Sequence, residues 1–388
     1  MQIPYLNILL RDMEEKDIAD EIRWHTIETE WALWDGPWEM EEVLATFDPE
    51  KHRREELEWL AKPKPDHRLS LELDADGVHI GSVNAYCLDD NLEWKPLELG
   101  ADHKAQHWAV GIEICESAYW SHGWGTRALT GYIHYHLKEG YTDLYTQTWS
   151  GNLRMIALAQ KLGFRECLRR PGLRQVRGGT YDGLTFKLDR EAFERHRAKL
   201  ERESLELYIP KIEDMAFRRE MMETPTTMAY NAGWNVSYSG YHPDTGCIDF
   251  PRSEWAVTHA RLTGNMPHSF YAYLRERSSG AFMGEVNFQA SSDGPWAEIG
   301  VVLHAPYKGR GYGRAALELL VETAFVDCGV PALRNTFEPE RSAALAIHRA
   351  VGFREVGCGS MNRFGKSQEL LVLELTREDY LRQREMQV

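Results

Sequence analysis

The sequence predicts an α+β fold that occurs twice in tandem, and three observations support this prediction. Three segments of the chain recur at nearly constant spacing. Strand-like and helix-like segments follow one another in the same order in both halves. A strand, a glycine-rich turn and a helix lie at the centre of each half. With 388 residues, the chain is long enough for two domains that each bury a core.

The repeated segments lie 187 to 189 positions apart. The pairs are 123–129 with 311–317, 157–166 with 344–355, and 188–193 with 375–380. This spacing indicates a duplication, so we expect one domain over residues 1–204 and a second over residues 205–388. The segment from Asp189 to Ser204 is charged and rich in helix-forming residues, which favours a helical connection over a flexible tether.

Hydrophobic periodicity and turn residues place the elements of each half. In the first half we expect strands at 8–10, 69–73, 78–83, 109–115 and 144–148, and helices over about 14–34, 124–139 and 154–162. In the second half we expect strands at 270–274, 282–288 and 298–303, then the glycine turn and a helix to about residue 328.

Composition narrows the class of protein. The formal net charge of −15 argues against nucleic-acid binding and favours cationic substrates such as amines. Without an apolar run of eighteen residues or a signal-like N-terminus, we expect neither a membrane span nor secretion. Six scattered cysteines without a Cys-x-x-Cys pair indicate free thiols in the cytoplasm. His103 and His107 have the spacing of helical metal ligands, but nothing completes a site, so we expect no metal.

The glycine turn indicates a phosphate-binding site. In the second half it reads Lys308-Gly309-Arg310-Gly311-Tyr312-Gly313, after a strand and at the start of a helix. Glycines let the backbone approach a ligand, and the helix N-terminus offers unpaired N–H groups to a pyrophosphate. Neither half has the surroundings of a Rossmann dinucleotide site, and the chain has no P-loop motif.

These residues resemble the pyrophosphate loop of the GNAT acyltransferases. The segment 305–313 fits the family pattern of a basic or amide residue, two further residues, and glycine-x-glycine. In the first half Trp120 stands at the basic position, which is similar to the ribosomal-protein N-terminal acetyltransferase branch. The resemblance covers both halves. It implies two GNAT folds, each a splayed mixed sheet flanked by helices with acetyl-CoA between its two middle strands.

The resemblance also assigns cofactor contacts. The strand before each turn should hold the pantetheine arm, the turn and helix start should hold the pyrophosphate, and an asparagine should touch the CoA arm. The residues at these positions are Ile112, Glu113, Ile114, Trp120, Ser121, His122, Gly123, Trp124, Gly125, Thr126 and Asn152 in the first half, and Gly300, Val301, Val302, Lys308, Gly309, Arg310, Gly311, Tyr312, Gly313 and Arg314 in the second. Arg341 stands where the second half should have the asparagine.

The family's chemistry is attack of a neutral amine on the thioester, which needs a base and an acid. In the second half Glu298 matches the family's base position, and His348 stands at the position of the usual acid, a tyrosine. The first half has Val110 and Ala159 there. Its other candidates are Glu113, which strand alternation places on the face opposite Val110, and the pair Tyr181 and Asp182. We therefore expect catalysis by Glu298 and His348.

Aromatic residues are concentrated where the acceptor should bind. Ten of the thirteen tryptophans lie in the first 150 residues. Trp24 and Trp31 are seven positions apart, which predicts one helical face packed in the core. The segment 34–39 mixes tryptophans with acids, a composition suited to a cationic amine. In the second half the aromatic segment 228–246 is expected to form a lid over the acceptor pocket.

The sequence thus predicts an acetyl-CoA-dependent N-acetyltransferase that acts on the primary amine of a small molecule, such as an antibiotic or amine metabolite. Two alternatives stay open. One is a non-catalytic protein that binds or senses acyl-CoA or serves in assembly. The other is an acetyltransferase for the α-amine of a protein N-terminus.

Overall fold

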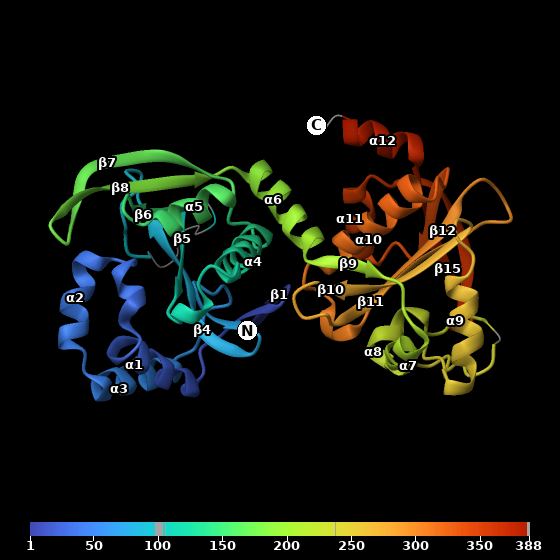
Figure 1. Cartoon of the computed structure of the whole chain (residues 1–388), viewed down its shortest axis with the longest axis horizontal. Coiled ribbons are helices and arrows are strands. Elements are labelled where there is room, and N and C mark those ends of the chain that lie inside the picture. Colours follow the sequence, from blue (N-terminus) through green and yellow to red (C-terminus); the bar gives the residue numbers. More distant parts are fainter. Residues whose placement is uncertain (98–103, 105, 237, 386–388) are drawn as a thin grey trace. The chain divides into compact units, whose positions relative to one another are not determined.

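The computed structural model describes residues 1–97, 104, 106–236 and 238–385 and divides into two compact units, Met1–Arg197 and Ala198–Val388. Each unit is built on its own sheet (Figure 1). The division falls within helix α6 (Arg190–Glu203), in the segment where a helical connection is expected. The boundary near residue 204 stays a prediction. Within the described residues, no helix combines the length and apolar character that a bilayer crossing requires.

The first unit contains an eight-stranded sheet in the order β1-β2-β3-β4-β5-β6-β8-β7. The strands are β1 (Gln2–Tyr5), β2 (Ile8–Arg11), β3 (Ser70–Ala75), β4 (Val78–Leu88), β5 (His107–Ile114), β6 (Leu144–Trp149), β7 (Phe164–Val176) and β8 (Gly179–Leu188). The helices are η1 (Glu15–Asp17), α1 (Ile18–Thr26), η2 (Thr29–Leu33), α2 (Pro37–Thr46), α3 (Pro49–Leu60), η4 (Ser117–Tyr119), α4 (Trp124–Lys138), α5 (Leu153–Lys161) and α6. Helix α4 contacts β1, β2, β4 and β5, and its Tyr132 is fully buried with Trp108 and Phe186 of the sheet.

Strands β5 and β6 separate soon after they pair. They run parallel, and their register contains only Trp108 with Leu144 and Ala109 with Tyr145. Beyond these pairs the ladder between β5 and β6 ends with the Thr146 hydroxyl, which donates to the carbonyl of Val110 at 2.8 Å, although β4 continues along the other edge of β5 to Ile114. The sheet is therefore splayed at its middle, and side chains or a ligand must fill the opening.

The second unit repeats this plan with seven strands in the order β14-β15-β13-β12-β11-β10-β9. The strands are β9 (Leu205–Tyr208), β10 (Ser269–Glu276), β11 (Phe282–Ala290), β12 (Ala297–Leu303), β13 (Ala332–Phe337), β14 (Arg354–Arg363) and β15 (Lys366–Thr376). The helices are η5 (Ile212–Asp214), α7 (Met215–Glu223), α8 (Pro225–Met228), η6 (Ala229–Asn231), η7 (Arg252–Glu254), α9 (Trp255–Thr263), η8 (Ala305–Tyr307), α10 (Tyr312–Glu322), η9 (Thr323–Asp327), α11 (Ser342–Val351) and α12 (Arg377–Glu385). Strands β12 and β13 again pair only at their start, through Ala297 with Leu333 and Glu298 with Arg334. Both units therefore confirm the predicted α+β class with a splayed mixed sheet.

One helix prediction needs correction. The expected helix over 14–34 is three pieces, because α1 ends at Thr26 and a separate 3-10 helix, η2, follows. This break lets the Trp31 indole N–H donate to the carbonyl of Trp24 at 2.9 Å, and both rings are buried in one cluster. Their core position is confirmed, but not one continuous helical face. The helix expected to end near residue 328 is confirmed, because α10 runs to Glu322 and the π-helical turn η9 extends it without a break to Asp327.

Candidate active site

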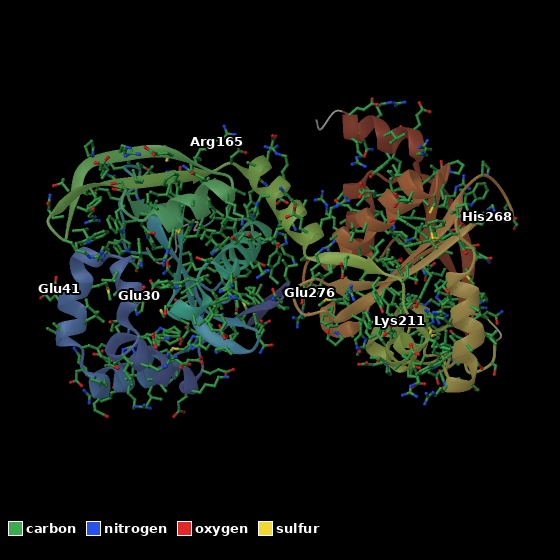
Figure 2. All side chains as sticks on the ribbon, viewed as in Figure 1. Glu30, Glu41, Arg165, Lys211, His268 and Glu276 are labelled. Atoms are coloured by element: carbon green, nitrogen blue, oxygen red, sulfur yellow. The ribbon has the colours of Figure 1, made fainter. Side chains whose placement is uncertain are left out.

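A cavity of about 450 Å³ lies in the first unit where β5 and β6 diverge. Its wall is formed by the end of β5, the glycine turn with the first turn of α4, the end of β6, helix α5, and the segment from Trp31 to Asp35. Figure 2 labels Glu30 and Glu41, exposed residues of η2 and α2 beside that last segment. The cavity collects the first-half cofactor residues expected from the sequence, namely Ile112, Glu113, Ile114, Trp120, Ser121, Gly123, Trp124, Gly125, Thr126 and Asn152, whereas His122 does not line it.

The N-terminus of α4 is open to an anion. Gly123 adopts a left-handed conformation with φ of 81°, and no side chain caps the helix or places an acid in its first turn. A methyl group on Gly125 would already contact Ile114 and Leu158 at 3.5 and 3.6 Å, so a longer side chain would compete for this space. Arg154 and Lys161 add positive charge to the wall. Unpaired N–H groups, a glycine floor and two cations fit the pyrophosphate of a CoA thioester.

Trp120, which replaces the usual basic residue, has two structural partners. Its indole N–H donates to the carbonyl of Ile114 at 2.7 Å, which joins the turn to the end of β5. The guanidinium of Arg154 lies between two indoles, 4.4 Å from the Trp120 ring and 4.6 Å from the Trp34 ring. The positive charge that the loop lacks in sequence is thus supplied by helix α5.

Asn152 uses both ends of its amide within the protein. Its oxygen caps α5 by accepting from the backbone N–H of Met155 at 3.0 Å, and its NH₂ group donates to the carbonyl of Trp34 at 3.0 Å. The indole of Trp149 donates to the same carbonyl at 2.9 Å. Asn152 therefore holds the Trp34–Asp35 segment in place, and its expected contact with the CoA arm stays a prediction.

Two carboxyl groups meet in the cavity. Asp35 and Glu113 share a side-chain hydrogen bond, and both line the opening. Asp35 keeps surface exposed toward the cavity and Glu113 is half-buried, yet protein atoms surround both closely. This enclosure, the charge of Asp35 and the shared hydrogen bond raise the pKa of Glu113 to about 8. Enclosure also raises the pKa of Asp35, against the opposite effect of the hydrogen bond.

Tyr86 and Gln147 extend this polar group. The Tyr86 hydroxyl donates to the Gln147 side-chain oxygen at 3.1 Å, and Gln147 lines the cavity. Burial and the charge of Asp35 raise the pKa of Tyr86 to about 12, so the phenol stays protonated near neutral pH. The composition of the segment that contains Asp35 predicts a cation site. The contact of Asp35 with Glu113, 78 positions away, could not be predicted from the sequence.

The loop after β5 also fixes the first helix. Glu116 accepts a hydrogen bond from the Trp24 indole at 2.7 Å and forms an ion pair with Arg23, both on α1. Helix α1 leads directly into η2 and the segment that carries Asp35. The wall that presents the acidic pair is thus attached to the loop that precedes the glycine turn.

Strand register corrects the expected correspondence between the halves. Gly111 lies opposite Asn84, and Gly300 lies opposite Asn287, so these two glycines occupy equivalent places. Glu298 then corresponds to Ala109, not to Val110, and Glu113 corresponds to Val302. The alignment slips by one because the segment from Cys115 to Gly123 is one residue longer than the segment from His304 to Gly311. Cys115 and His304 are themselves equivalent, since each donates its backbone N–H to the strand before, to Ile80 and Met283.

The two predicted catalytic residues of the second half have different partners. Glu298 is exposed and accepts from the Trp296 indole at 3.2 Å. His348 is buried in α11, where Nδ1 donates to the carbonyl of Ala344 at 2.8 Å and Nε2 accepts from Asn335 at 2.9 Å. Burial lowers the pKa of His348, so the ring is neutral with both nitrogens engaged. Their roles as base and acid stay predictions.

Several residues of the second glycine turn have partners within the protein. Lys308 donates to the carbonyls of Thr226 and Thr227 at 2.8 and 3.2 Å. A methyl group on Gly311 would lie 3.0 Å from a carboxylate oxygen of Glu201. The other residues assigned to this half are placed around the turn: Gly309 is open, Arg310 lies near the Tyr307 ring, the Tyr312 hydroxyl donates to Glu276, and Arg314 pairs with Glu318. Gly313 contacts Ile347, while Gly300, Val301 and Val302 lie on β12.

The remaining sequence candidates also have partners within the protein, and their functional roles stay predictions. Asp182 accepts from Arg169 and from the backbone of Gly172 in the β7–β8 hairpin, and the Tyr181 ring packs edge-on against Trp149. In the second unit Arg341 lies 5.5 Å from the rings of Tyr230 and Phe337. His107 pairs with Asp143, whereas His103 lies outside the described residues.

The segment expected to form a lid in the second unit is folded on itself. The Asn231 amide donates to the carbonyl of Gly246 at 2.9 Å, and the Tyr241 hydroxyl donates to the carbonyl of Asn231 at 2.7 Å. Nearby, the Glu285 carboxylate accepts from the Tyr271 hydroxyl at 2.5 Å and pairs with Arg218. The charge of Glu285 on β11 is therefore compensated by the guanidinium of Arg218. Among the residues that the structure describes, the neighbours that shift the pKa values of Asp35 and Glu113 are all acids.

Comparison with known proteins agrees with this geometry. The model of the acetyltransferase (GNAT) domain matches residues 7–165 and again residues 205–354. Among solved structures, the chain is similar to a spermidine N-acetyltransferase from Vibrio cholerae in complex with CoA and spermine, at 14% identity over 46% of this chain and 99% of that one, with a TM-score of 0.39. A GNAT acetyltransferase from Bacillus anthracis gives 14% identity over 45% and 96%, with a TM-score of 0.37. No curated protein matches the chain. The two matched regions cover most of the chain, which therefore belongs to the GNAT family as an acetyl-CoA-dependent N-acetyltransferase with two such domains.

Proposed function

We propose that the first unit acetylates the primary amine of a small cationic molecule and that Glu113, with Asp35, receives the proton of the ammonium group. The observation that carries this proposal is the pair of hydrogen-bonded carboxyls in the cavity of the splayed sheet. Among the described residues, no lysine or arginine is a neighbour that shifts the pKa of Asp35 or Glu113. A cationic acceptor would supply the missing positive charge.

The positively and the negatively charged groups of the cavity suit different substrates. The open N-terminus of α4, with Arg154 and Lys161, suits the phosphates of acetyl-CoA. When bound, acetyl-CoA supplies an acetyl group activated as a thioester. Asp35 and Glu113 suit the ammonium group of the acceptor, and the rings of Trp31 and Trp34 suit its apolar part. An anionic cofactor and a cationic acceptor can therefore share one cavity.

Glu113 suits the role of base because of its raised pKa. An ordinary glutamate is too weak a base to take a proton from an alkylammonium ion, whereas a group with a pKa near the working pH balances ionisation against basicity. The N–H bond of the ammonium breaks, the proton goes to a Glu113 carboxylate oxygen, and the amine keeps the electron pair. Asp35, one hydrogen bond away, stabilises the proton on Glu113.

A thiol-release assay over a panel of amines tests the proposal. The panel contains polyamines, aminoglycosides, simple diamines and a peptide with a free N-terminus. With an accepted small amine, Glu113→Gln should lower kcat/KM by about 10²- to 10⁴-fold. Glu298→Gln is the matched control and should change it little. The family position of Glu298 predicts the reverse order, so a larger loss in Glu298→Gln would place the chemistry in the second unit. Acetylation of the peptide alone would favour the N-terminal α-amine alternative.

For the second unit, we propose a CoA-binding role without its own proton transfer. Val302 stands at the place of Glu113, both nitrogens of His348 are engaged, and Arg218 neutralises Glu285. Absence of turnover with every amine by the whole chain, despite CoA binding, would instead support the non-catalytic alternative for both units.

A further inference from the structure

A second cluster of ligand-type side chains lies apart from the cavity, between α1 and α3. Glu21 of α1 and His52 and Glu56 of α3 each place one nitrogen or oxygen within 4.8 Å of the others. His52 and Glu56 are four positions apart, so both side chains leave the same face of α3. Helix α3 packs on α1, which brings Glu21 to that face. The distance from His52 Nε2 to a Glu21 carboxylate oxygen is 2.9 Å.

The side chains of this cluster have few partners within the protein, and none of these is a lysine or arginine. The Glu21 side chain has His52 as its ion-pair partner, and the Glu56 side chain has no hydrogen bond or ion pair within the described part of the chain. Lys51, one turn before Glu55, pairs with that exposed glutamate and not with Glu56. Two half-buried carboxylates held together without a lysine or arginine favour a bound cation.

A neighbouring cluster shows what a compensated arrangement looks like. Asp17, Asp20 and His79 also lie within 4.8 Å of one another. There, however, Asp17 pairs with Arg11 at 2.6 Å and Asp20 pairs with Arg23 at 3.0 Å. His79 is closed in by Glu72 on its other nitrogen at 2.9 Å. In this network arginine side chains provide the positive charge. The cluster of Glu21, His52 and Glu56 has the same spacing but no such arginine.

We propose that Glu21, His52 and Glu56 bind one divalent transition-metal ion of the zinc class. One imidazole nitrogen and two carboxylate oxygens form a ligand set that zinc accepts, with remaining positions for water. The His52 and Glu21 side chains are each 20% exposed, so an ion can enter and keep a water ligand. The His52 ring is held from behind by the rings of Phe47 and His25, at 5.2 and 5.9 Å. The ion replaces the proton between His52 Nε2 and Glu21, and that proton goes to solvent.

The proposed ion would tie the two helices together. Its three ligands come from α1 and α3, and α1 continues through η2 to Trp31 and Asp35 in the cavity wall. An occupied site therefore stiffens the support of that wall without contributing a group to the cavity. The three ligands lie outside the cavity, so zinc can bind there whichever unit carries the chemistry. The sequence did not indicate it, because Glu21 precedes His52 by 31 positions and only the packing of α1 on α3 unites them.

Zinc binding by the whole chain tests this site. The protein is stripped with a chelator, and Zn²⁺ alone is titrated by calorimetry, with a chromophoric chelator as competitor. We expect one equivalent per chain that Glu56→Gln or His52→Gln weakens at least tenfold. Glu56 has no hydrogen-bond or ion-pair partner to lose among the described residues, so its variant should keep the wild-type circular dichroism and melting temperature. His242→Gln is the matched control, because His242 is also paired with a carboxylate, Asp249, but lies in the second unit and outside the cluster.

The outcomes separate clearly. Loss of the same single equivalent in both cluster variants, with the control unchanged, supports the site. Weak binding by the exposed thiols Cys167 and Cys358 would persist in all variants and cancels in the comparison. No equivalent bound by the wild type, or wild-type affinity in Glu56→Gln, overturns the proposal. A preference for Ca²⁺ over Zn²⁺ overturns the assigned class of ion.

Discussion

The pH dependence of catalysis should follow the ionisation of Glu113. Enclosure and the neighbouring Asp35 raise the pKa of Glu113 to about 8, so the carboxyl is mostly protonated at neutral pH. A base must be deprotonated to act, and kcat/KM reports the ionisation of the free enzyme. With this pKa, about one molecule in eleven carries the active carboxylate at pH 7 and about half do at pH 8. The Glu113 contribution to kcat/KM should therefore rise about fivefold over that unit and level off near pH 9.

The assay must separate this ionisation from that of the substrate amine, whose pKa lies near that of lysine at about 10.4. Measuring kcat/KM from pH 6 to pH 9.5 for the wild type and for Glu113→Gln achieves this, because the amine contributes equally to both. The ratio of the two values should climb and then level off with a midpoint near pH 8. A ratio that does not change with pH would refute the reasoning, and so would a rise centred near the ordinary pKa of glutamate.

Three further predictions concern the surroundings of the cavity and the stability of the first unit. Asn152→Ser can keep the cap on α5 but loses the donor to Trp34, so we expect a wild-type melting temperature, a kcat/KM lower by about 10- to 100-fold, and a lower midpoint of the pH profile as Asp35 moves from Glu113. An unchanged midpoint would mean that Asn152 does not position Asp35. Arg11→Met leaves Asp17 buried without its guanidinium and should cost about 3–5 kcal/mol of unfolding free energy in urea, whereas Lys51→Met in an exposed pair should change it by less than about 1 kcal/mol. Burial lowers the pKa of His67 to about 4 and that of His136 to about 3, so their imidazole ¹⁵N shifts should still report neutral rings at pH 5; charged rings there would contradict the burial seen for this pair.

Most of the fold could be predicted because the same order of strands, turns and helices occurs twice in the sequence. The glycine turns, the strands before them and the helices after them recur at a spacing that short insertions barely disturb. What could not be predicted were features that depend on one residue or on long-range packing. The break between α1 and η2 comes at Ile27 and Glu28, where no glycine or proline stands, and it brings the Trp31 indole to the carbonyl of Trp24. The short strand β1 gave no periodic signal over its four residues.

The site was harder to predict for a physical reason. The sequence spacing places Glu113 on the strand, but on the face opposite Val110, where the base is expected. In the structure, the splay of β5 from β6 decides which side chains line the cavity. The segment with Asp35 was recognised by its composition alone. Its approach to Glu113 is fixed by Trp149 and Asn152, which hold the Trp34 carbonyl from the far side of the opening.

The one additional residue between Cys115 and Gly123 has a consequence for how the copies diverged. By strand register, Cys115 matches His304 and the short helices η4 and η8 match each other, so the residue gained in the first half is Glu116. That residue holds Trp24 and Arg23 of α1. In the first copy this one side chain therefore joins the loop proposed to hold the nucleotide to the helix that leads into the wall proposed for the acceptor.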